Sequence, residues 1–196
     1  MMFVLTVDQR KSRKREDLVE AAMDALNHDA LRPLVLPFDR TAGDEMQAVA
    51  AEPAVVVSIA MELAVSSHWS VGIGIGSVKR PLPDNTRAGA GEAFERARSA
   101  VTSAKNASGN IAVSGASPQA GQAEALLQLL VLVARRRSEL SEEAGILSDQ
   151  GLTQQQIARQ LGISQQAVSS RLQSGLWQES RRVLSVAESL LEGADR

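Results

Sequence analysis

Residues 152–174 carry the pattern that most restricts what this chain can fold into, because it fits two short helices joined by a tight turn. Thr153 can cap the first helix, and Ser164 can cap the second. Between them, Gly162 can adopt the left-handed conformation that such a turn requires. The apolar residues fall where two packed helices and their turn need them: Ile157, Leu161, Ile163, Val168 and Leu172. The sequence therefore predicts a helix-turn-helix.

Polar residues occupy the opposite face of the second predicted helix. Glutamine can pair with adenine in the major groove, and serine is a permissive donor and acceptor. Segment 151–186 has four arginines against one acid, Glu179, which is the charge sign that DNA phosphates favour. We therefore expect contacts with double-stranded DNA from Thr153, Ser164, Gln165, Gln166, Ser169, Ser170, Arg171 and Gln173. The alternative is a helical hairpin that only packs against protein.

Residues 152–182 resemble the helix-turn-helix of sigma-factor-like and resolvase-like domains. The resemblance implies a recognition helix at 164–173 and no target sequence. An apolar stripe follows, formed by Leu176, Val183, Leu184, Ala187, Leu190 and Leu191. Its predicted partner is the apolar helix at 125–134, either within one subunit or across a dimer. Because one half-site rarely gives enough affinity, we expect a homodimer.

Composition restricts the cofactors and the compartment. The chain has no cysteine and only two histidines, His28 and His68, which excludes disulfides and argues against a zinc site. The first seven residues are apolar but too short for a secretory signal. The apolar run at 125–134 is shorter than the roughly 20 residues that span a bilayer. We expect a cytoplasmic protein without a membrane segment.

Strand and helix patterns alternate over the first 115 residues. Strands are predicted at 3–7, 34–38, 46–50, 69–78 and 111–113, and helices at 16–26, 53–65 and 91–105. This order predicts an α+β fold with the helices on one face of a mostly antiparallel sheet. Gly72, Gly74 and Gly76 share one face of their strand, which predicts close packing of a helix. A segment rich in Ser, Gly and Pro at 114–121 predicts a boundary between domains 1–115 and 116–196.

Two acids and a basic loop, residues 10–15, are predicted to meet at one end of this sheet. Asp8 ends the first strand, and Asp44 lies in the hairpin turn. Two carboxylates together with phosphate oxygens suit Mg²⁺. The basic loop precedes a helix N-terminus, so an anionic partner would relieve its repulsion. We expect Mg²⁺ at Asp8 and Asp44, and a nucleotide or other anion at Arg10, Lys11 and Arg13. The alternative is an ordinary hairpin turn at Asp44 and a loop contact or an ion pair at Asp8.

The segments at 7–14, 41–45 and 71–76 together resemble the SatD family and, more distantly, the nucleotide cyclases and diguanylate cyclases. The resemblance covers residues 3–113. It implies a ferredoxin-like or nucleotide-cyclase-like N-terminal domain, followed by an all-α helix-turn-helix domain. It also implies that Asp8 and Asp44 would be the metal ligands.

The late helix departs from the cyclase pattern. Glu95 is near the position where cyclases carry Asn, and only Arg96 or Arg98 can supply their Arg. We therefore predict ligand binding without turnover and assign no catalytic residue. The leading interpretation is a DNA-binding transcriptional regulator with a ligand-sensing or assembly domain at its N-terminus. The alternatives are a Mg²⁺-dependent nucleotide-binding or cyclase-like enzyme and a protein that only mediates assembly.

Overall fold

The computed structural model describes residues 1–194, in which five strands form one sheet with the order β2-β3-β1-β4-β5. The strands are β1 (Met2–Gln9), β2 (Leu36–Ala42), β3 (Glu45–Ala50), β4 (Trp69–Gly76) and β5 (Ile111–Ser114). All neighbouring pairs are antiparallel except β4 and β5, which run parallel. The predicted α+β composition and the mostly antiparallel sheet are thus confirmed.

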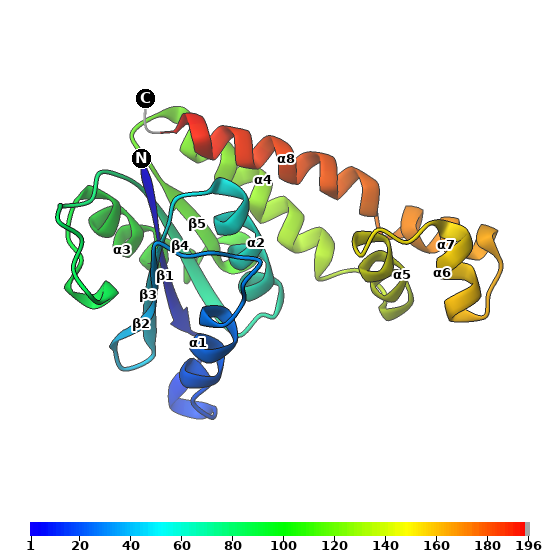
Figure 1. The fold of residues 1–196 in the computed structure, drawn as a ribbon, viewed down its shortest axis with the longest axis horizontal. Helices are drawn as coiled ribbons and strands as arrows, with labels where there is room; N and C mark the ends of the chain where they lie inside the picture. The colour runs from blue at the N-terminus through cyan, green and yellow to red at the C-terminus, as the bar shows by residue number, and fades with distance from the viewer. Residues whose placement is uncertain (195–196) are drawn as a thin grey trace.

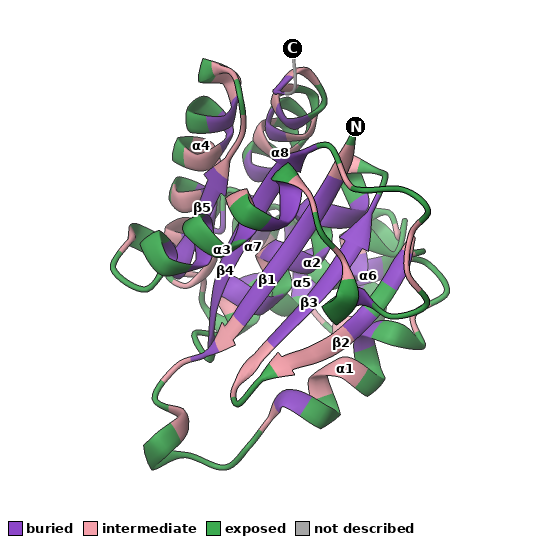
Figure 2. Cartoon of the chain, turned by 90° about the vertical axis from the view of Figure 1, so that its left-hand side faces the viewer, coloured by how far each residue is buried: buried purple, intermediate pink, exposed green. Residues whose placement is uncertain are grey.

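Helices cover both faces of this sheet, as Figures 1 and 2 show. They are α1 (Val19–Asn27), α2 (Pro53–Val65), α3 (Glu92–Ala104), α4 (Pro118–Ala134) and α8 (Trp177–Gly193). α3 packs alone on one face, and the other four share the apolar core of the opposite face. Our prediction that helices lie on one face was wrong, because β4 is buried on both sides and the parallel crossover to β5 carries α3 over the second face.

The glycines of β4 let α3 approach the sheet closely. A Cβ atom on Gly74 would lie 2.1 Å from the Ala93 carbonyl oxygen, and one on Gly72 would lie 2.2 Å from the Val101 nitrogen. Both contacts are far shorter than van der Waals distance. The predicted packing of a helix against these glycines is therefore confirmed.

Helices α4 and α8 lie antiparallel to each other and complete the larger core (Figure 1). Buried residues of both helices belong to the same cluster as the inner residues of the strands: Ala120, Ala123, Leu127, Val131, Ala187 and Leu191. The apolar stripe after the helix-turn-helix thus packs on its predicted partner within one chain. Although α4 is apolar nearly all round, no helix within residues 1–194 is both long and apolar enough to cross a membrane.

A smaller lobe of three helices projects from the end of the α4–α8 pair (Figure 1). It contains α5 (Glu139–Asp149), α6 (Gln154–Leu161) and α7 (Gln165–Ser174). Its core is separate and consists of Ala144, Leu147, Ile157, Ala158, Val168, Leu172 and Trp177. Packing therefore groups α4 and α8 with the sheet, across the boundary that composition predicts at 114–121.

Candidate functional site

The turn between α6 and α7 is fixed by side-chain caps at both helix starts. Thr153 accepts a hydrogen bond from the backbone N–H of Gln156, and the Gln156 side chain accepts one from the backbone N–H of Thr153 at 2.8 Å. Gly162 ends α6 at φ 65° and ψ 32°, in the left-handed region that favours glycine. Ser164 Oγ accepts from the Ala167 N–H at 3.1 Å. All three predicted positions of this motif are confirmed.

α7 is anchored from one side only. Val168 and Leu172 are buried in the core of the lobe, against α5 and α6. Ser141 of α5 donates its hydroxyl to the Arg171 carbonyl oxygen at 2.8 Å, which also ties α7 to α5. The opposite face of α7 is therefore left to solvent.

The exposed face of α7 carries five polar side chains: Gln165, Gln166, Ser169, Ser170 and Gln173. Within residues 1–194 none of these side chains makes a hydrogen bond to another protein group. Gln154 of α6 joins three of them around a shallow hollow. The structure thus brings most of the predicted DNA-contacting residues onto one face with free donors and acceptors.

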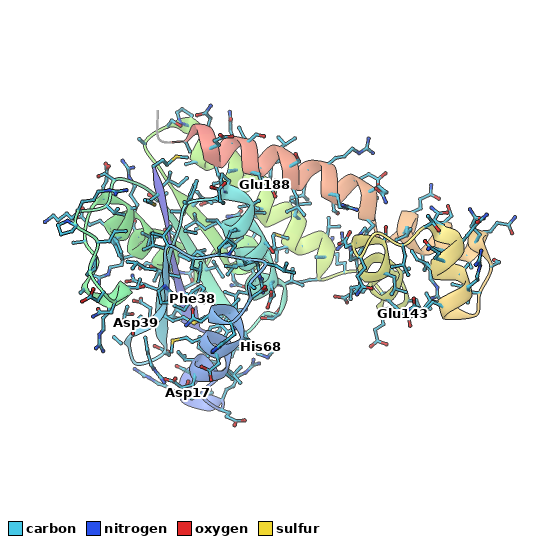
Figure 3. The ribbon with its side chains drawn as sticks, in the orientation of Figure 1. Asp17, Phe38, Asp39, His68, Glu143 and Glu188 are labelled. Carbon is cyan, nitrogen blue, oxygen red and sulfur yellow. The ribbon has the colours of Figure 1, made fainter. Side chains whose placement is uncertain are left out.

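Three predicted contacts are engaged within the protein: the hydroxyls of Thr153 and Ser164 act as helix caps, and the third is Arg171. Its guanidinium faces α5 and pairs with Glu143 at 3.2 Å, on the part of the lobe where Figure 3 labels Glu143. Arg181 pairs with Asp149 at 3.3 Å, and Arg182 lies 3.6 Å from Glu179. Of the four arginines counted in the sequence, Arg159 alone forms no ion pair among the described residues. The positive charge available to phosphates is smaller than the composition of the segment indicates.

Two arginines, Arg135 and Arg137, join the lobe to the rest of the protein, a role that sequence analysis did not predict. Arg135, just after α4, donates to the Ala64 carbonyl oxygen at the end of α2 and to Asn110 Oδ1. Arg137 stacks over the Trp177 ring, 4.1 Å from its centroid, and burial lowers the pKa of its guanidinium. The connection between the lobe and the rest of the protein is therefore held by specific contacts on both sides.

The second predicted site lies at the end of β1, where a loop at 10–17 leads to α1. Figure 2 shows the loop as an exposed excursion, and Figure 3 labels Asp17 far from the lobe. Buried Gln9 closes this loop: its Nε2 donates to the Glu16 carbonyl oxygen at 2.6 Å, and its Oε1 accepts from the Leu18 N–H at 2.9 Å. Sequence analysis missed this clamp, because a glutamine at a strand end has no distinctive pattern.

Asp8 and Asp44 lie at the same end of the sheet, as predicted. Two adjoining hollows of about 470 and 400 Å³ lie there, and Gln9, Ser12, Arg13 and Asp44 line both. Lys11 and Lys14 line the larger one beside Asp8. Within the described residues, no cluster of three or more carboxylate or imidazole groups could hold a metal ion.

Arg10 differs from the other predicted anion-binding residues. Its guanidinium points away from the hollows and donates to Asn110 Oδ1 at 2.8 Å and to the Ser67 carbonyl oxygen. It therefore shares an acceptor with Arg135 instead of facing an anion. Only Lys11 and Arg13 of the predicted set line the hollows.

The candidate arginines on α3 do not join the carboxylates. Arg96 donates to the Ile75 carbonyl oxygen at 2.5 Å, at the end of β4 that pairs with the start of β1. Asp8 is at the other end of β1, so Arg96 cannot act beside it. Glu95 and Arg98 are exposed, and so are His28 and His68.

Comparison with known proteins shows which family the lobe resembles. Residues 128–178 match the family model described as sigma-70, region 4, which covers α5, α6 and α7 and leaves the sheet outside the match. No curated protein and no solved structure matches the chain. The chain therefore has a C-terminal helix-turn-helix domain, and the resemblance of its N-terminal part to SatD and the cyclases stays a prediction.

Proposed function

We propose that this chain is a cytoplasmic DNA-binding transcriptional regulator in which α7 enters the major groove and the sheet region senses a ligand. The free polar face of α7 carries the proposal. This face lies opposite the buried anchor of the helix, and its amides and hydroxyls are of the kinds that pair with base edges. The match to sigma-70 region 4 supports the same interpretation.

Fluorescence anisotropy of labelled DNA from the region upstream of the chain's own gene tests the recognition face. Gln165→Glu and Ser169→Glu are expected to weaken binding, because each places a carboxylate against phosphates and base edges. Ser99→Glu, on the exposed surface of α3, is the matched control and should bind normally. Unchanged affinity in both lobe variants would refute α7 as the recognition helix.

Because few arginines of the lobe are free of ion pairs, we expect the affinity for DNA to depend only weakly on the salt concentration. Among the described residues Arg159 is the one arginine of the four that forms no ion pair, so few phosphates are expected to be neutralised by each lobe. Arg159→Gln should weaken binding to all sequences alike and reduce the slope of log K against log salt by about one. A steep slope that this variant leaves unchanged would mean that other cations bind the backbone.

A second copy of the chain is the partner that we propose for the outer face of α4 and α8. Leu129 on α4 is 55% exposed, and Val186 on α8 is 52% exposed, although both helices bury their inner faces within the chain. Pairing of two chains would supply a second recognition helix where one offers little charge. Sedimentation of the protein should show a dimer that Leu129→Glu dissociates; a monomer at all concentrations would refute it.

Ligand sensing is the role that we propose for the sheet region, rather than turnover. The hollows at the end of β1 hold the predicted Asp8, Asp44, Lys11 and Arg13 together, which supports binding. The distance of Arg96 from these carboxylates argues against a cyclase-like reaction. Formation of a cyclic or linear nucleotide product from any of the four triphosphates with Mg²⁺, lost in Asp8→Ala, would overturn this view.

A further inference from the structure

Lys105 occupies a specific position beside the predicted metal ligand. It follows the last residue of α3, where the helix dipole favours a cation. Its Nζ lies 2.7 Å from Asp8 Oδ2, and the Asp8 side chain is only 14% exposed. The pair joins residues 97 positions apart in the chain, so the fold itself places this ammonium group at the end of β1.

Asp44 is also engaged within the protein. Its Oδ2 accepts a hydrogen bond of 2.5 Å from the Ser12 hydroxyl, which belongs to the loop after β1. The bonds to Lys105 and Ser12 occupy one oxygen of each carboxylate, and the Lys105 ammonium neutralises the charge of Asp8. A divalent cation here would meet the repulsion of that ammonium and only one uncompensated carboxylate, so the residues present do not fit a metal ion as they are arranged.

The remaining charges around the larger hollow are positive. Lys11, Arg13 and Lys14 line it, all are exposed, and none forms an ion pair or a side-chain hydrogen bond among the described residues. With Lys105 neutralising Asp8, these three cations face the single charge of Asp44. A cavity of this size accommodates a small ligand, and its charge selects an anion.

We infer that this hollow binds a small phosphate-bearing anion without a divalent metal, and that Lys105 supplies beside Asp8 the positive charge that a metal would otherwise bring. The inference rests on the proposed ligand-sensing role of the sheet region and names the ligand class. Lys11 and Arg13 contact the phosphate oxygens, since ammonium and guanidinium groups form strong charge-assisted hydrogen bonds with them.

Calorimetric titration of the full chain with inorganic triphosphate tests the inference, with no DNA present. Saturable binding is expected in EDTA, and added Mg²⁺ should not strengthen it. Arg13→Gln should weaken binding about tenfold or more, the usual effect of losing a charged hydrogen bond. Arg98→Gln, which removes an exposed arginine from α3, should bind as the wild type does.

The variant Lys105→Gln tests whether Lys105 takes the place of a metal ion beside Asp8. It should lose about tenfold or more of the metal-free affinity and gain binding that depends on Mg²⁺, because Asp8 is then released to a metal. Lys79→Gln is the control at an exposed lysine. Circular dichroism melting checks that the variants are folded, and rescue of metal-free binding in Lys105→Arg would show that the charge matters.

Three results would overturn the inference: no triphosphate binding at low salt, wild-type binding only with Mg²⁺, or equal affinities in the wild type and Arg13→Gln. Titration with the four nucleoside triphosphates identifies the source of the phosphate. Tighter binding of one of them supports a nucleotide ligand, and equal binding supports recognition of phosphate alone. Because DNA is absent, failure here leaves the recognition-face proposal standing, and loss of DNA binding leaves this inference standing.

Discussion

Replacing Gly74 with Ala would place a methyl group between β4 and α3. The added Cβ would lie 2.1 Å from the Ala93 carbonyl oxygen and 2.3 Å from the Ala97 nitrogen, where ordinary contacts begin at 3.4 Å. Both obstructing atoms belong to the backbone, so no side chain can rotate away. α3 would have to retreat from the sheet by more than 1 Å.

The expected loss of stability follows from the disrupted packing between α3 and β4. Overpacking a close-packed core costs about 1–3 kcal/mol, and the upper end applies here because a whole helix must move. For a protein of this size, 1 kcal/mol corresponds to about 2–4 °C, so the melting temperature should fall by about 6–12 °C. Thermal unfolding followed by circular dichroism measures this change.

Gly121→Ala is the matched control, since it makes the same chemical change on α4 with no atom within 4 Å of the new Cβ. Alanine is favoured over glycine in a helix by about 1 kcal/mol, so this variant should melt at a slightly higher temperature. If Gly74→Ala melts at the wild-type temperature while the control behaves as expected, the reasoning about the approach of α3 is refuted.

Thr153→Ala removes the capping box of α6 and should lower the free energy of unfolding by about 1 kcal/mol, which urea titration measures; an unchanged midpoint would show that the cap contributes nothing. The pKa of Asp17 is lowered below its ordinary value of 3.8 by the Val19 N–H bond and by Arg40. Its stabilising effect should therefore be present above pH 4 and be lost as the pH falls below that value, and Asp17→Asn should lack this part of the acid sensitivity in pH-dependent melting. Arg137→Ala removes the stacking on Trp177 and the hydrogen bonds to the Gly175 carbonyl oxygen and Ser180, so Trp fluorescence should change and the lobe should melt earlier than the sheet; a single transition at the wild-type temperature would contradict this.

Local sequence signals predicted most of the elements and the whole helix-turn-helix motif. The signals at Thr153, Gly162 and Ser164 work within a few residues, so neighbouring sequence is enough to interpret them. The glycines of β4 were informative for a similar reason, since their spacing alone indicates which face lacks side chains.

The placement of α3 and the partners of the charged residues depend on distant parts of the chain. The pairs Lys105–Asp8 and Arg10–Asn110 each join segments about one hundred residues apart, and no local pattern indicates such contacts. For this reason the sequence predicted which carboxylates meet at the end of β1, but not that one of them already has a cation.

The order of the elements has a consequence for how the protein is made. The lobe is inserted between α4 and α8, and the larger core is complete only when residues of α8 such as Ala187 and Leu191 have joined it. During synthesis the helix-turn-helix therefore leaves the ribosome before α8, which packs on α2 and α4. Since the contacts within the lobe are close in sequence, it can fold early, while the apolar faces of α2 and α4 still lack their last helix. We expect nascent chains that stop before α8 to expose those faces and to require chaperones.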